Sequence, residues 1–331
     1  MSSLNLPSLG LGGVAIGNGF QSLSDQRAEE TLEAAWEAGI RYYDTSPWYG
    51  LGLSERRFGR FLRNQDRNDY LLSTKVGRVL TATDTPPETM WVNPSPFDYR
   101  YDYSAGAVRR SLEDSLQRLG VERIDYVFIH DLSPDHDDEY GEGTTWEDHF
   151  EVALDGAMPE LTRMRDEGLI KGWGLGVNTI DPILRTLEAG HSADLFLSAI
   201  QYTLLDHQDS LNRLFPAIEE SGAGLIVAAP FNSGLLAGQD HYNYGLETTR
   251  EQRTRLGRIH ELADNMGVDM VDACIQFSFA PKVVDTVLFG ASKPEQVRAS
   301  AAALDRKVPK EFWKVIRDEG LIDNRAPVPG D

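Results

Sequence analysis

The sequence predicts a closed (β/α)8 barrel, and three observations carry that prediction. The chain has 331 residues, which suits one such barrel. Short apolar runs alternate with amphipathic helical patterns, which indicates a parallel sheet covered on its faces. Eight such runs can be counted, and eight units favour a closed barrel over an open sheet. We expect a single domain over residues 1–331, with loop insertions at about 77–103 and 131–150 and a C-terminal tail at about 305–331.

Helical patterns connect the predicted strands, and capping residues mark several helix ends. Ser24 precedes a helix that stops at Gly39, and Ser104 precedes another that stops at Gly120. Ser54 is expected to cap a helix over 54–63. Further helices are predicted over 159–167, 180–190 and 211–221 and, as a pair, between 249 and 279; the strands are predicted over 9–13, 42–44, 70–76, 124–131, 170–177, 196–203, 222–230 and 284–291.

Composition argues against several classes of function. The formal net charge of −20 disfavours nucleic-acid binding, because a polyanion would be repelled over most of the surface. No apolar run is long enough for a membrane span, and the N-terminus lacks the features of a signal peptide. Cys274 is the only cysteine, so no internal disulfide can form, and we expect a cytoplasmic protein. The acidic stretch 133–148 lacks the ligand spacing of a calcium loop; we interpret it as a solvated loop and expect no metal site.

Polar residues stand at the ends of successive predicted strands. The second strand ends in Asp44, with Tyr49 in the loop beyond it, and the third and fourth carry Lys75 and His130. Each has an ordinary structural explanation when taken singly, as a turn former, a core aromatic or a surface lysine. In a barrel, however, these strand ends meet at one mouth, where functional residues lie. Their coincidence therefore predicts a site.

The chemistry of this set indicates a proton donor and acceptor. A phenol has a pKa near 10, and a nearby ammonium favours the phenolate and lowers that pKa. Lys75 needs a counter-charge in a barrel mouth, and Asp44 can supply it. His130 can hydrogen-bond a substrate oxygen and orient it. The set contains no hydride source, so a redox reaction there requires a cofactor.

At this point the sequence resembles the aldo-keto reductases. The resemblance covers about 9–304 and includes YYDTSPWYGLGLSERRFGRFL, YLLSTKVGR, SLEDSLQRLGVERIDYVFIHD, GWGLGVN and GLIVAAPFNSGLLAG. It implies that Asp44, Tyr49, Lys75 and His130 form the catalytic tetrad, the set that the chemistry selects. It also implies a (β/α)8 barrel with a nicotinamide dinucleotide bound across its mouth.

The resemblance implies the cofactor contacts as well. NADP-preferring members commonly hold the 2′-phosphate with a Lys and an Arg after the last strand, where this chain has Gly290 and Gln296. We therefore expect NAD as the cofactor; NADP is the alternative, because Lys293 and Arg298 stand nearby. The expected cofactor-binding residues are Asn178 and Gln201 for the carboxamide, Phe231 as the ring beside the nicotinamide, Ser233, Gly234, Leu235 and Gly238 over the pyrophosphate, and Gly290, Ser292 and Gln296 near the adenosine.

A polar alcohol is the substrate class that the resemblance implies. The loop 91–104 is similar to that of the NAD-dependent branch that oxidises sugars at C1, and cellular NAD pools favour oxidation. Tyr49 would then act as the base, and Trp48, Trp91 and Phe97 are the predicted pocket walls. The expected partner is a small-molecule carbonyl or alcohol, and the sequence does not specify an oligomeric state.

Three other functions fit parts of the pattern. The first is an NADPH-dependent aldehyde or ketone reductase with the same tetrad, which cofactor profiling would distinguish. The second is a class I aldolase that forms a Schiff base on Lys75, against which the pairing of Asp44 with Tyr49 argues. The third is a non-catalytic, cofactor-sensing subunit, against which the intact tetrad argues.

Overall fold

Eight parallel strands close into a barrel in the computed structural model, which describes residues 4–141, 143–245 and 247–330. Around the barrel the strand order is β1-β10-β9-β8-β7-β6-β3-β2. The barrel prediction is confirmed, and each predicted strand overlaps one of these eight. The barrel strands are β1 (Leu9–Gly12), β2 (Tyr42–Asp44), β3 (Leu71–Val76), β6 (Tyr126–His130), β7 (Gly172–Val177), β8 (Leu195–Ala199), β9 (Gly224–Ala228) and β10 (Thr286–Gly290).

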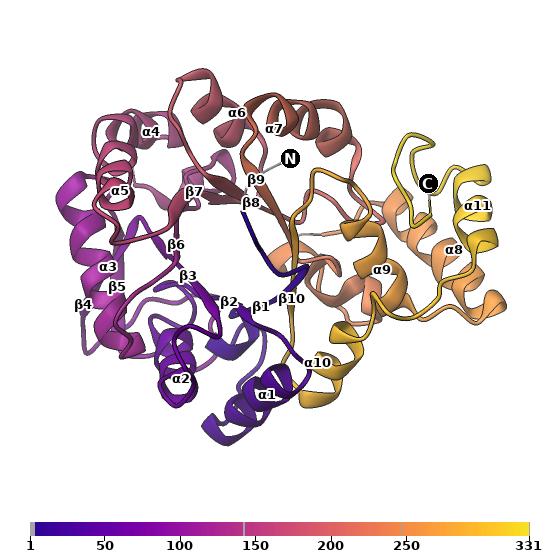
Figure 1. The fold of residues 1–331 in the computed structure, drawn as a ribbon, viewed down its shortest axis with the longest axis horizontal. Coiled ribbons are helices and arrows are strands. Elements are labelled where there is room, and N and C mark those ends of the chain that lie inside the picture. The colour runs from indigo at the N-terminus through magenta and orange to yellow at the C-terminus, as the bar shows by residue number, and fades with distance from the viewer. Residues whose placement is uncertain (1–3, 142, 246, 331) are drawn as a thin grey trace.

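Helices surround the strands, with α11 against α8 at one outer edge (Figure 1). Ser24 caps α1 and Ser104 caps α3 as predicted, each accepting a backbone N–H with its hydroxyl oxygen. Ser54 is a correction: α2 begins one residue earlier after Gly52, and the Ser54 hydroxyl instead donates to the carbonyl of Gly13 at 2.9 Å. The helices are α1 (Asp25–Glu37), α2 (Leu53–Leu62), α3 (Ala105–Leu119), α4 (Trp146–Asp155), α5 (Ala157–Asp166), α6 (Asp181–Glu188), α7 (Phe215–Ser221), α8 (Arg250–Met266), α9 (Met270–Phe279), α10 (Pro294–Ala301) and α11 (Lys310–Asp318).

The core has two parts, because neighbouring residues of a strand point to opposite faces. A small cluster fills the barrel interior, and a larger one lies between the strands and the helices. Tyr42 belongs to the inner cluster and its neighbour Tyr43 to the outer one. The barrel is therefore packed solid, and only its ends can hold a ligand.

A hairpin that the sequence did not predict follows β3 directly. Its strands β4 (Arg78–Ala82) and β5 (Phe97–Tyr101) are antiparallel and pair Arg78 with Tyr101. Gly77 makes the turn from β3 into β4 with φ of +114°, and a Cβ there would lie 2.4 Å from the Tyr103 ring, so only glycine fits. The hairpin occupies the expected insertion 77–103, and a short 3-10 helix, η2 (Pro134–Glu139), occupies the other.

Candidate active site

The four predicted catalytic side chains meet at the carboxyl ends of three adjacent strands. Asp44 ends β2, Lys75 lies near the end of β3, and His130 ends β6. These strands are neighbours in the barrel, with Asp44 opposite Ser73 and Lys75 opposite Phe128. Tyr49 lies in the loop between β2 and α2. Parallel pairing thus brings Asp44, Lys75 and His130 together, and the loop after β2 adds Tyr49.

Asp44 and Lys75 form a buried ion pair. The Lys75 Nζ donates to Asp44 Oδ2 at 2.6 Å and to the Thr45 carbonyl at 2.8 Å. The Ser73 hydroxyl donates to the other carboxylate oxygen of Asp44 at 2.7 Å. Lys75 is 1% exposed and Asp44 3% exposed, so each charge depends on the other for compensation. The pair holds an ammonium group at a fixed point of the mouth.

Tyr49 stands over this ammonium group. The Lys75 Nζ lies 4.6 Å from the centre of the Tyr49 ring, whose edge meets the His130 ring at a centroid distance of 5.7 Å. Burial, with Asp44 and Asp131 adding to it, raises the pKa of Tyr49 well above its ordinary value, although Arg78 opposes this rise. The predicted lowering of the Tyr49 pKa is therefore wrong for the protein without a bound cofactor. The Lys75 charge is largely compensated by Asp44, so burial prevails.

His130 is a neutral imidazole in this environment. It is 6% exposed, and its Nδ1 lies 3.1 Å from the Ser46 hydroxyl. Burial lowers the pKa of His130 well below its ordinary value; Lys75 and Arg78 contribute to the lowering, while Asp131 opposes it. The Tyr103 hydroxyl donates to the His130 carbonyl at 2.9 Å and fixes the strand end. A neutral ring can donate a hydrogen bond without carrying charge.

Behind His130 lies a charged cluster that sequence reasoning missed. Arg78 is 1% exposed and donates to Asp131 at 2.5 Å, and its guanidinium lies 4.5 Å over the Trp48 ring. Asp131 Oδ2 lies 3.5 Å from His136 Nε2, and His136 Nδ1 lies 3.2 Å from Glu139. The interpretation of 133–148 as a solvated loop is therefore wrong at His136, which η2 packs against Asp131. The one local signal was the carboxylate directly after the strand-end histidine.

Aromatic side chains form one wall beside Tyr49. The Trp91 ring lies 5.7 Å from the Tyr49 ring and 5.5 Å from the Trp48 ring. Tyr99 of the hairpin, which was not predicted, packs on Trp48 at 4.6 Å. Phe97 lies at the far end of the hairpin, with the guanidinium of Arg56 5.2 Å from its ring. The wall beside Tyr49 is thus built from Trp48, Trp91 and Tyr99.

Neutral side chains and unusual backbone conformations follow the other strands. The Gln201 side-chain amide donates to the Asn178 carbonyl at 2.5 Å, so the two predicted carboxamide partners are adjacent. Asn178 itself donates to Asp135 at 3.1 Å. Three successive residues of the predicted pyrophosphate loop in η4 (Asn232–Ala237) have positive φ, +48° at Asn232, +58° at Ser233 and +108° at Gly234. The first two are strained, whereas glycine adopts this conformation readily.

The last predicted cofactor segment begins at the end of β10. Gln296 accepts from the Ser292 backbone N–H at 2.9 Å, and Gln21 donates to the Ser292 hydroxyl at 2.8 Å. Gly290 ends β10 and offers no side chain. Among the cofactor candidates, Phe231 precedes η4 and packs on the outer core, while Leu235 and Gly238 lie in and just after η4.

These residues fit a nicotinamide dinucleotide. The donor set consists of amides and hydroxyls, which suit a carboxamide and ribose hydroxyls. Asn232 Oδ1 is buried and has no hydrogen-bond partner among the described residues, although its amide nitrogen donates to Asp206 at 2.9 Å. An acceptor left free beside a strained loop is consistent with a polar ligand that the loop holds.

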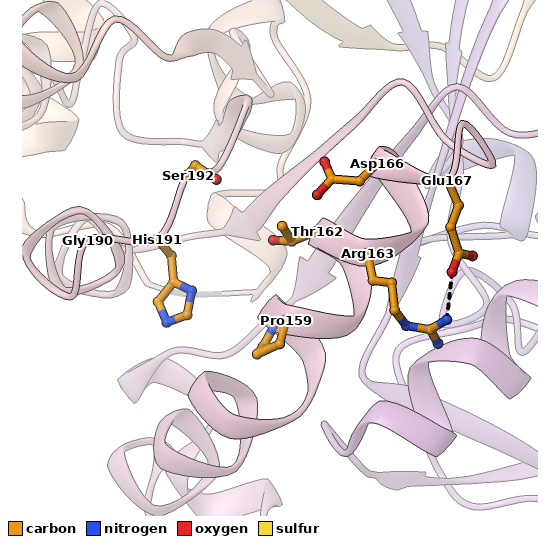
Figure 2. Close-up of a pocket in the computed structure, with 8 residues that line it drawn as sticks. All are labelled: Pro159, Thr162, Arg163, Asp166, Glu167, Gly190, His191 and Ser192. Atoms are coloured by element: carbon orange, nitrogen blue, oxygen red, sulfur yellow. Dashed lines mark hydrogen bonds and ion pairs between the residues drawn. The ribbon is translucent and has the colours of Figure 1, made fainter.

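The chain also has a separate cavity of about 500 Å³. Figure 2 shows the residues that line it. The cavity lies between α5 and the segment that leads into β8, and is lined by Pro159, Thr162, Arg163, Asp166, Glu167, Gly190, His191 and Ser192. These residues precede β7 or β8, so the cavity is at the amino ends of the strands, opposite the tetrad.

Neither a membrane span nor a metal centre is found where the structure describes the chain. None of the helices in 4–141, 143–245 and 247–330 is both long and apolar enough to cross a bilayer. Over the same residues, no three His, Cys, Asp or Glu side chains gather in a way that could hold a metal ion.

Comparison with known proteins identifies the family of the chain. The model of the aldo/keto reductase family matches residues 8–319. A D-threo-aldose 1-dehydrogenase from Pseudomonas sp is 36% identical over 97% of this chain and 96% of its own length. A pyridoxal 4-dehydrogenase from Microbacterium luteolum is 35% identical, with 97% and 96% covered. The holo form of an aldo-keto reductase from Bacillus halodurans shares the fold, with a TM-score of 0.74 and 24% identity over 100% of this chain and 96% of that one. The chain belongs to the aldo/keto reductase family, whose members transfer hydride between a nicotinamide cofactor and a small carbonyl or alcohol substrate.

Proposed function

We propose that this protein oxidises an aldose, or a similarly polar alcohol, at C1 with NAD as the hydride acceptor. The observation that carries the proposal is the place of Tyr49, whose ring centre lies 4.6 Å from the Lys75 Nζ and 5.7 Å from the centre of the His130 ring. The two relatives at 35–36% identity, named as an aldose 1-dehydrogenase and a pyridoxal 4-dehydrogenase, support the substrate class.

The residues of the chain would carry out the proton chemistry. Oxidation breaks the C1–H and O–H bonds of the substrate and leaves a C1 carbonyl; bound NAD supplies the hydride acceptor and a positive charge. Tyr49, as the phenolate, takes the hydroxyl proton. Lys75, paired with Asp44 at 2.6 Å, would favour the phenolate from 4.6 Å below the ring centre, and His130 would hydrogen-bond to the substrate oxygen.

The preference for NAD rests on the segment after β10. Gly290 and Gln296 stand where a 2′-phosphate would need positive charge, and Gln296 is already bonded to Ser292. A phosphate dianion would lack a charged partner at both positions. Lys293 directly precedes α10 and Arg298 lies within it, so two positive charges are near in sequence and the experiment must compare both cofactors directly.

The test is a panel of aldoses and pyridoxal-type alcohols with NAD and NADP at equal concentrations, followed by absorbance of the reduced cofactor. We expect oxidation with NAD, faster than with NADP by about tenfold or more, which corresponds to about 1.4 kcal/mol. A clear advantage for NADP would refute the cofactor preference. Failure to oxidise any alcohol, together with reduction of aldehydes by NADPH, would instead support the reductase alternative.

A further inference from the structure

The two ring nitrogens of His130 face different polar groups. Nδ1 lies 3.1 Å from the Ser46 hydroxyl, and Nε2 lies 3.5 Å from Asp131 Oδ2. A neutral imidazole carries its proton on one nitrogen only, so one nitrogen donates and the other accepts. The neighbours of the ring therefore decide which nitrogen can donate to a substrate.

Ser46 favours an accepting Nδ1. Its side chain is fully buried, and its oxygen already accepts the Trp48 backbone N–H at 3.1 Å. The Ser46 proton then needs an acceptor, and the His130 Nδ1 lone pair is within reach. If Nδ1 carried the proton instead, the Ser46 hydroxyl would lose this acceptor, and an unsatisfied buried donor costs about 1–3 kcal/mol.

Asp131 favours a protonated Nε2 from the other side of the ring. Burial alone would raise the pKa of Asp131, but the positive charges of Arg78 and His136 outweigh it and hold that pKa well below its ordinary value. An Nε2 lone pair facing this carboxylate would be repelled, whereas an Nε2–H is attracted. The distance of 3.5 Å is too long for a strong hydrogen bond, so this N–H is still available to a ligand.

Arg78 compensates the negative charge of the Asp131 carboxylate. Its guanidinium bonds to Asp131 at 2.5 Å, and it contributes with Lys75 to keeping the His130 ring neutral. Without this compensation, the charge of Asp131 would favour an imidazolium. The cluster behind His130 thus allows a directed N–H without a positive charge on the ring.

We infer that Ser46 and Asp131 are positioning residues that fix His130 as the tautomer with its proton on Nε2, ready to donate to the oxygen on the reacting carbon. The identity of that oxygen rests on the proposed function, but the tautomer does not. Neither residue is one of the four that the sequence selects.

The decisive measurement is the ¹⁵N spectrum of the His130 ring. The full-length chain is labelled with ¹⁵N-histidine at neutral pH without substrate, and His130→Asn assigns the signals. We expect the shift pattern of a neutral ring protonated at Nε2. An Nδ1–H ring or an imidazolium in the wild type would overturn the inference. Since no turnover is required, this result is independent of whether the protein oxidises aldoses.

Variants connect the tautomer to catalysis. In Ser46→Ala we expect signal of the Nδ1–H form and a kcat lowered about tenfold, equivalent to about 1.4 kcal/mol, with KM for NAD unchanged. Ser46→Thr keeps a hydroxyl and should restore the Nε2–H pattern. The matched control is Ser111→Ala, a buried serine on α3, which should change neither readout.

Each other outcome counts against the inference. A Ser46→Ala enzyme that keeps the wild-type tautomer would show that Ser46 does not set it, whatever its activity. An equal loss of kcat in Ser111→Ala would show a general packing effect. If the Ser46 variants do not fold, the wild-type spectrum still decides which nitrogen carries the proton.

Discussion

The two halves of the barrel mouth differ in the chemistry of their side chains. At the ends of β2, β3 and β6, the site consists of charged side chains fixed by buried ion pairs, Lys75 with Asp44 and Arg78 with Asp131. At the ends of β8 and β9, it consists of amides and hydroxyls, with the carboxylate of Asp206 behind Asn232, on backbone with positive φ, such as +60° at Ile200 and +57° at Ala229. The first half sets proton affinities, and the second presents shape and neutral hydrogen bonds.

This difference predicts how each half responds to substitution. Removing one partner of a buried ion pair has a large effect on stability, because the other charge is left buried and uncompensated. A loop held by neutral hydrogen bonds weakens gradually, because each bond contributes only about 1 kcal/mol. Substitutions in the first half should therefore change turnover or stability, and those in the second should change cofactor affinity.

The largest expected effect comes from Tyr49→Phe. Loss of the hydroxyl removes the proton acceptor, so kcat should fall about 10²–10⁴-fold with no change in the melting temperature. Steady-state kinetics with NAD and the best alcohol would measure this. A variant that kept a tenth of the wild-type turnover would remove Tyr49 from the proposed role.

The next effect is on stability, from Asp44→Asn. The Lys75 ammonium would be left buried without its counter-charge, and we expect a loss of about 3–5 kcal/mol in the free energy of unfolding, measured with urea. The matched control is Asp181→Asn, which breaks an exposed pair with Arg213 and should cost less than about 1 kcal/mol. Similar losses in both variants would erase the contrast between buried and exposed pairs.

The pH dependence of the oxidation rate tests the role of Tyr49. Its raised pKa means that the phenolate is scarce near neutrality, so oxidation should accelerate with rising pH by up to about tenfold per unit. The measurement is kcat/KM for the alcohol from neutral to alkaline pH. A profile that is flat over that range would contradict proton transfer to Tyr49 in the rate-limiting step.

In the other half, Asp206→Asn should weaken cofactor binding alone. Asp206 accepts from Asn232 at 2.9 Å and from the Tyr242 hydroxyl at 3.0 Å, and so fastens the loop around η4. We expect KM for NAD to rise about tenfold while kcat stays within about twofold. The control is the exposed neighbour Asp209→Asn. A fall in kcat without a change in KM would break the proposed division between the halves.

The smallest effect is a pH-dependent one at His136, which faces Asp131, Asp135, Glu139 and Arg78. Burial alone would lower its pKa, but Asp131 and Glu139 outweigh burial and raise it from 6.5 to about 10. Because the pKa of His136 is higher in the folded protein than in the unfolded chain, the protonated histidine stabilises the fold at any pH below the unfolded-state pKa. This stabilisation is lost as the pH rises through the folded-state pKa. His136→Gln should therefore lower the melting temperature at pH about 6, and much less above pH about 10. A pH-independent difference would contradict the ion-pair account.

Much of the fold and the tetrad could be predicted because their signals are local. The strand ending at Asp44 and the strand ending at His130 are short apolar runs followed by polar residues, and parallel pairing brings such ends together. The hairpin β4–β5 was missed because its strands, of five residues each, are short and are separated by a proline-containing segment. The cap predicted at Ser54 was wrong because Gly52, in a left-handed conformation, precedes the helix and Ser54 lies inside it.

The sequence by itself determined the barrel, the order of its strands and the four residues that meet at its mouth. Tertiary structure alone decided the protonation states: the raised pKa of Tyr49, the neutral ring of His130 and the buried pair of Arg78 with Asp131, 53 residues apart. The physical reason is that strand periodicity depends on neighbours along the chain, whereas a pKa depends on burial and on charges brought close only by folding.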